Sequence, residues 1–152
     1  MSARQETTRH IARVRELLGE AVYELHRRGR VHDQSKFAPV EINALERLHE
    51  VIQQEGPAPY GSDAYRERTA LLGPMLEHHY ANNSHHPEHY PNGVAGMDLF
   101  DLVEMFFDWK AASERNSDDA MNLSYSVEKY GIPSMLESIL RNTATRLGFP
   151  HK

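Results

Sequence analysis

DLFDLVEMFFDWKAASE (residues 98–114) is the most apolar stretch of the sequence, and it decides the predicted fold class. Its large apolar side chains recur every three or four residues, which is the spacing of one helix rather than of a strand. They are Leu99, Phe100, Leu102, Val103, Phe106, Phe107 and Trp109. So much apolar surface surrounds this helix that some of its acidic side chains are expected to face inward.

Helical spacing continues on both sides of this stretch, and no segment alternates with a period of two for long enough to predict a strand. Breaks such as GPAPYGS (56–62) separate the periodic segments, and Pro74 is expected to kink or divide one of them. We expect an all-α bundle of about six helices over 4–28, 39–54, 62–80, 98–114, 118–130 and 133–146, folded as one domain over 1–152.

The composition limits the chemistry that the protein can perform. The chain has 152 residues, 39% of them hydrophobic, and no cysteine. Disulfides, thiolate metal ligands and a cysteine nucleophile are therefore excluded, and any metal must take nitrogen and oxygen ligands. The lack of cysteine is typical of a cytosolic protein, so we expect a cytoplasmic location.

The charge and hydropathy pattern limits the partners. The net charge is −5 with histidine counted as neutral, which argues against a nucleic-acid partner. No apolar run reaches membrane-spanning length, so no membrane partner is expected. Four aromatic residues are candidates for an exposed homodimer surface: Phe100, Phe107, Tyr125 and Tyr130.

HHYANNSHHPEHY (78–90) concentrates five of the ten histidines in thirteen positions. It opens a stretch, 81–97, that is expected to be a long loop, and such loops in compact domains are commonly functional. Because neutral imidazole is the commonest metal ligand, a metal site is favoured over the alternative of a polar surface loop.

Other candidate ligands lie far from this cluster in the sequence. His10 shares a helical face with Val14 and Leu17, where a histidine taken alone is more often a hydrogen-bonded core residue than a ligand. The motif HDQSK begins with the adjacent pair His32 and Asp33. Three acidic residues then share one stripe of the helix at 98–114: Asp101, Glu104 and Asp108. Helical bundles build metal sites from ligands on facing helices, so we expect these side chains to converge around a cation.

The blocks HDQSK (32–36) and HHPEHYPNGVAG (85–96) resemble motifs of the HD-domain superfamily of metal-dependent phosphohydrolases, with Ser35 where the family motif has glycine. The whole chain also resembles a small bacterial and phage family that carries the blocks HDxSK, HHPEH and EMxxDWKA. The resemblance implies an HD-like helical fold and phosphohydrolase activity.

The resemblance also implies roles for particular residues. The primary metal site is expected to consist of His10, His32, Asp33 and Asp108. Asp33 would bridge to a second ion held by His79 and by either His85 or His86, and Lys36 would contact the substrate phosphate. We favour Asp108 over Asp101 as the last ligand.

The expected reaction is hydrolysis of a nucleotide or another small phosphate ester by a metal-activated water. Glu88 or a further histidine would protonate the leaving group, and Asn83, with Asn82, would orient ligands or bind substrate. The donor set suits one or two ions of Mn or Fe first, with Co, Ni or Zn as alternatives. Two other functions are weighed: a di-iron oxygenase, and a non-catalytic helical module stabilised by metal.

Overall fold

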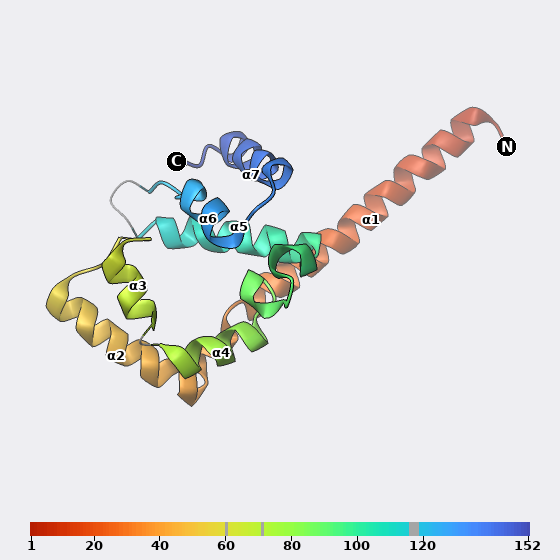
Figure 1. Ribbon diagram of the computed structural model, residues 1–152. Coiled ribbons are helices and arrows are strands. Elements are labelled where there is room, and N and C mark those ends of the chain that lie inside the picture. The colour runs from red at the N-terminus through yellow and green to blue at the C-terminus, as the bar shows by residue number, and fades with distance from the viewer. Residues whose placement is uncertain (60, 71, 116–118) are drawn as a thin grey trace. The chain divides into compact units, whose positions relative to one another are not determined.

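The chain is helical in the computed structural model, which describes residues 1–59, 61–70, 72–115 and 119–152 (Figure 1). The described residues form seven α-helices and three short 3-10 helices, and no strand forms among them. The all-α prediction is confirmed. The chain divides into two compact units, Met1–His32 and Asp33–Lys152. The single domain expected over 1–152 stays a prediction.

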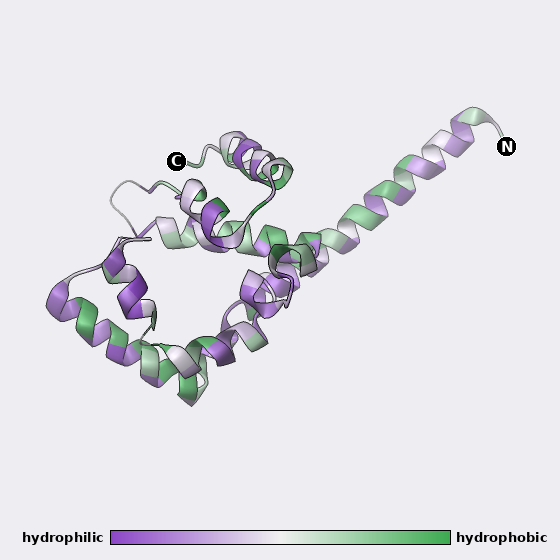
Figure 2. Cartoon of the chain, in the orientation of Figure 1, coloured by the Kyte–Doolittle hydropathy of each residue, from purple (hydrophilic) through white to green (hydrophobic). Residues whose placement is uncertain are grey.

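The first unit is essentially one long helix, α1 (Ala3–Val31). The Ser2 hydroxyl accepts a hydrogen bond from the Gln5 backbone N–H, and the Gln5 side chain accepts one from the Ser2 N–H, which satisfies the first amides of the helix. Green apolar positions alternate with purple polar ones along α1 (Figure 2). None of its 29 residues, all of which the structure describes, is buried. The packed inward face expected around His10 is therefore not formed within this unit.

The second unit begins with a 3-10 turn, η1 (Gln34–Phe37), and the helix α2 (Pro39–Glu55). Pro39 occupies the first turn of α2, where its missing N–H costs no helical hydrogen bond. The segment expected as one helix over 62–80 forms two, α3 (Asp63–Ala70) and α4 (Gly73–Asn82). Pro74 lies in the first turn of α4, so the alternative of a break is confirmed. The helices α2 and α4 pack side by side.

The stretch expected as a long loop over 81–97 is more ordered than predicted. Helix α4 extends to Asn82, and two 3-10 turns follow, η2 (Pro87–His89) and η3 (Gly93–Gly96). Backbone hydrogen bonds close this stretch at short range, including the His86 N–H to the Asn83 carbonyl at 3.2 Å. Turns of this kind bond locally, so they leave no helical periodicity in the sequence to reveal them.

The helices α5 (Leu99–Ser113), α6 (Leu123–Tyr130) and α7 (Ser134–Leu147) carry the main hydrophobic core. Its buried members are Phe106, Met121, Leu123, Ile132, Leu140 and Ala144. Gly131 ends α6 with a φ of 60°, as the YGIP break predicts, while residue 118, where an earlier helix start was expected, lies outside the described residues.

The expected dimer surface is only partly exposed. Phe107 is 47% exposed, whereas Tyr130 stacks on Trp109 with ring centroids 5.8 Å apart. The homodimer stays a prediction.

Candidate metal centre

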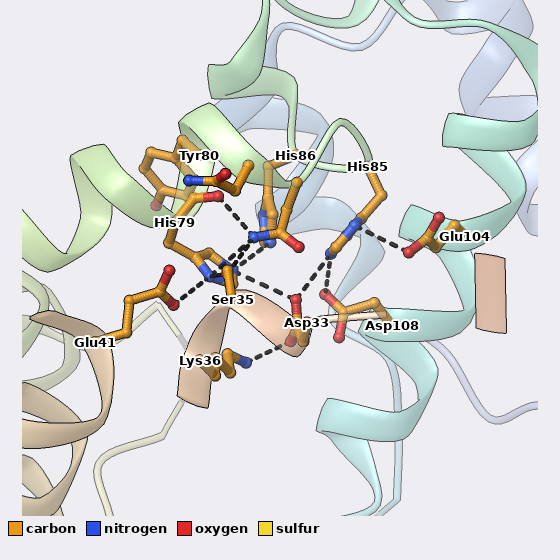
Figure 3. A network of polar contacts seen from close by, with 12 residues as sticks. Asp33, Ser35, Lys36, Glu41, His79, Tyr80, His85, His86, Glu104 and Asp108 are labelled. Carbon is orange, nitrogen blue, oxygen red and sulfur yellow. Dashed lines mark hydrogen bonds and ion pairs between the residues drawn. The ribbon is translucent and has the colours of Figure 1, made fainter. Parts of the chain in front are cut away.

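Asp33 lies at the middle of a polar cluster in the second unit (Figure 3). It precedes η1 with a φ of 55°, a left-handed conformation that aspartate tolerates better than most residues. Its Oδ2 atom is 2.5 Å from Lys36 Nζ. Its Oδ1 atom lies 3.5 Å from the Nε2 atoms of both His79 and His85. One carboxylate oxygen therefore faces two imidazoles that come from different sides.

His79 is held by a buried carboxylate from a neighbouring helix. It lies on α4 with its side chain 5% exposed, and its Nδ1 is 2.8 Å from Oε2 of Glu41 on α2. Burial alone would raise the pKa of Glu41, but hydrogen bonds from His78, Ser35 and His79 outweigh it and lower the pKa. An ionised carboxylate only accepts hydrogen bonds, so Nδ1 of His79 is the donor. In the neutral ring, Nε2 then carries a lone pair directed toward the cluster.

His86 approaches the same nitrogen from the turn after α4. Its Nε2 lies 2.9 Å from Nε2 of His79. Burial, and after it the neighbouring imidazoles of His85 and His79, lower the pKa of His86 to about 3. His86 is therefore neutral at physiological pH. Two imidazole nitrogens this close need either a proton or a metal cation between them.

His85 repeats the arrangement of His79 with a different helix. Its side chain is 2% exposed, and its Nδ1 lies 3.1 Å from Oε1 of Glu104 on α5. Asp108, one turn further along α5, has its Oδ2 4.0 Å from Nε2 of His85. Since side chains four residues apart share one helical face, α5 presents both carboxylates to His85.

The separations within the cluster fit shared ligation of a cation. Two atoms bound to one ion at about 2.1 Å lie about 3.0 to 3.4 Å apart when the bonds meet at about 90 to 109°. The pairs His79–His86 and Asp33–His79 are separated by 2.9 and 3.5 Å. One ligand atom from each of Asp33, His79 and His86 falls within 4.8 Å of the other two. These side chains could therefore hold a metal ion, as the sequence predicted.

Polar side chains behind the ligands fix their positions. Asn83, which caps the end of α4, is buried and donates to the Ser35 hydroxyl and to the His79 carbonyl, each at 2.7 Å. Ser35 in turn hydrogen-bonds Glu41. Of the two roles expected for Asn83, orienting the ligands is the one that these contacts support.

Asp101 has a different structural role from Asp108. It is buried and accepts hydrogen bonds from the Ser84 hydroxyl at 2.6 Å, from the Tyr90 hydroxyl at 2.7 Å and from the Asp98 N–H at 3.2 Å. The bond to Asp101 is the main reason that the pKa of Tyr90 is raised. Asp101 therefore ties the turns after α4 to the start of α5, and Asp108 is the aspartate beside His85.

Three further predicted residues are His10 and His32, which belong to the first unit, and Glu88, which belongs to the second. His10 is exposed on α1, and His32 is the C-cap of α1 and the last residue of the first unit. Their roles as ligands stay predictions. Glu88 is exposed, with Oε1 3.7 Å from Lys129 Nζ, so the proposed proton donor faces another partner. The role of Glu88 as a proton donor stays a prediction.

Sequence reasoning missed the two glutamates that hold the histidines. Glu41 lies in the first turn of α2, where an acidic residue is ordinary because it complements the helix dipole. In the sequence, Glu104 stands out only as one member of the acidic stripe at 98–114. The available signal was a carboxylate on an otherwise apolar helical face, since such a group is costly to bury without a donor.

Comparison with curated proteins and with solved structures finds no match for this chain. Among the described residues, no helix combines the length and the apolar character needed to cross a membrane. The match to a family model spans residues 1–146. The chain therefore belongs to the family described as a family of unknown function, DUF5662.

Proposed function

We propose that the protein binds two divalent transition-metal ions that share Asp33. His79 and His86 would serve one ion, and His85 and Asp108 the other. The observation that carries this proposal is the position of Asp33 Oδ1, 3.5 Å from the Nε2 atoms of both His79 and His85. Both imidazoles are buried and both have Nδ1 against a glutamate, which is the usual support for a metal-bound histidine.

The mixed nitrogen and oxygen donors favour a metal of intermediate hardness. Imidazole suits Fe, Co, Ni and Zn, whereas carboxylate also suits Mn. Mn or Fe is proposed first because each ion would receive both donor types. The sequence resemblance adds His10 and His32 as further ligands, and their substitution belongs to the same test.

We propose that this centre hydrolyses a small phosphate ester. A bound divalent ion lowers the pKa of water to about 7 and polarises a phosphoryl oxygen, so it supplies a nucleophile at neutral pH. Lys36 is suited to the substrate phosphate, because its side chain is 37% exposed and its Nζ lies 2.5 Å from Asp33 Oδ2. Lysine acts here as a compact positive charge that phosphate oxygens can reach. Asp33 would keep that charge beside the reacting group.

The test is release of phosphate from a panel of nucleotides and simple phosphate esters, with Mn²⁺ or Fe²⁺ added to metal-free protein. Asp33→Ala, His79→Ala and His32→Ala should each abolish metal-stimulated release. Glu50→Gln is the matched control, because Glu50 is an exposed acidic residue on α2. Anaerobic turnover with Mn²⁺ would support hydrolysis, whereas turnover that requires Fe and oxygen would contradict it. Full activity in Asp33→Ala would remove the proposal.

A further inference from the structure

Two glutamates from different helices stand behind the histidines of the cluster. Glu41 on α2 is fully buried and its Oε2 lies 2.8 Å from Nδ1 of His79. Glu104 on α5 is 13% exposed and its Oε1 lies 3.1 Å from Nδ1 of His85. The two pairs share no residue and no helix, yet each leaves its imidazole with Nε2 toward the same oxygen of Asp33 (Figure 3).

We propose that Glu41 and Glu104 are paired positioning residues, which hold His79 and His85 in the Nδ1–H tautomer and thereby set the affinity of the centre for metal. The proposal rests on the metal centre proposed above. A carboxylate can only accept at Nδ1, so it excludes the tautomer that would place the proton on Nε2. It also makes the imidazole a stronger donor to a cation.

The surroundings of Glu41 show how its position is maintained. Its second oxygen, Oε1, lies 2.7 Å from Nδ1 of His78, and Ser35 also hydrogen-bonds the carboxylate. Because His78 and Ser35 flank the carboxylate, Glu41 cannot rotate away from His79 without losing several hydrogen bonds. Glu104 is more accessible than Glu41 and lies one helical turn from Asp108. The helix α5 therefore carries both the proposed ligand Asp108 and the carboxylate that holds His85.

The experiment measures Co²⁺ binding to the full chain by competition with a chelator, using the visible absorption of the bound ion. Glu104→Gln and Glu41→Gln should each weaken binding about 10- to 100-fold, the usual cost of losing such a support. Glu104→Ala should weaken binding more than Glu104→Gln, since the amide oxygen of glutamine still accepts a hydrogen bond. Glu50→Gln on α2 should bind as the unaltered protein does.

Two further readouts separate positioning from general stability. A purely structural role would lower the Tm of the metal-free and metal-loaded forms equally, whereas the proposal expects the metal-induced rise in Tm to shrink. Nitrogen NMR of the Zn²⁺-loaded protein should show His79 and His85 with Nδ1 protonated, and Glu104→Gln should broaden or shift the signal of His85 alone. If Glu41→Gln fails to fold, the Glu104 variants still decide.

The outcomes distinguish this proposal from the proposed hydrolase. Unchanged Co²⁺ affinity in both Glu104 variants, with phosphate release intact, overturns the positioning role and leaves the hydrolase standing. Weakened affinity in a protein that never releases phosphate supports the positioning role and removes the hydrolase. A protein that binds no metal at all overturns both.

Discussion

Asp33 concentrates several demands on one carboxylate. Its backbone is left-handed, its Oδ2 pairs with Lys36, and its Oδ1 faces both His79 and His85. A carboxylate has two acceptor oxygens, so Oδ2 can pair with Lys36 while Oδ1 stays available to a metal cation held by the imidazoles. Replacement by asparagine would retain the shape but remove the negative charge that pairs with Lys36 and would attract a metal cation.

The two inward aspartates of α5 should separate cleanly by mutation. Asp101→Ala removes the acceptor for Ser84 and Tyr90, so we expect a loss of about 2–4 kcal/mol in the free energy of unfolding, with metal affinity retained by the folded fraction. Asp108→Ala should instead weaken metal binding and leave the free energy of unfolding of the metal-free protein nearly unchanged, because Oδ2 of Asp108 lies beside Nε2 of His85. Urea unfolding and metal titration of both variants are the measurements; identical behaviour of the two would contradict the distinction.

The metal-free protein should become less stable as the pH is lowered, because of His86. In the unfolded chain this imidazole takes up a proton near its ordinary pKa of about 6.5. In the folded protein, burial and the imidazoles of His85 and His79 hold its pKa at about 3. The unfolded state therefore binds more protons between these values, and stability declines as pH falls from about 6.5 towards 3.

The measurement is the urea midpoint of metal-free protein as a function of pH. His86→Gln should reduce the slope over that window, because it removes the group whose pKa differs between the two states. A pH profile of His86→Gln that superimposes on that of the unaltered protein would show that other groups cause the decline.

At the scale of single elements, the two 3-10 turns after α4 depend on a small residue. A Cβ added to Gly96 would lie 2.7 Å from Cβ of Tyr90, closer than such atoms normally approach. Tyr90 cannot withdraw without loosening its hydrogen bond to Asp101. Gly96 therefore allows η3 to lie close to the preceding turn.

Gly96→Ala should accordingly cost about 1–3 kcal/mol of stability, the range for overfilling a packed site. Gly73→Ala is the matched control, because a Cβ at Gly73 meets nothing within 4 Å. Thermal unfolding of the two variants checks this, and equal stability would show that the turn adapts. We also expect Gly96→Ala to weaken metal binding, since His85 and His86 directly precede η2.

At the scale of the whole molecule, the metal should contribute to stability. Any ligand that binds only the folded state stabilises it, by about 2.7 kcal/mol at a concentration 100 times its Kd. For a chain of this size, that corresponds to a rise in Tm of roughly 5–10 °C. Scanning calorimetry before and after chelation, with metal restored as the control, measures the change. A Tm indifferent to chelation and to added Mn²⁺ or Fe²⁺ would argue against the centre.

Helix positions were predictable from the sequence because each depends on local chemistry. The apolar spacing at 98–114 predicts α5, and Gly131 predicts the end of α6. Pro74 predicts either a kink or a break, and the structure has the break. The histidine density at 78–90 likewise predicts a metal site, since ligand chemistry can be read from residue type alone. The candidate ligands Asp33, His79, His85, His86 and Asp108 follow from the sequence pattern and its family resemblance.

Which residues meet was decided by tertiary packing. The sequence could not show that Nε2 of His79 lies beside Nε2 of His86, or that Nε2 of His85 lies near Asp108. Both contacts depend on how the chain turns after Asn83. Nor could it show that Glu41 and Glu104 support the imidazoles, or that Glu88 turns to Lys129. Residue type and spacing set local conformation and donor chemistry, whereas the pairing of distant polar groups depends on which helical faces are buried against each other.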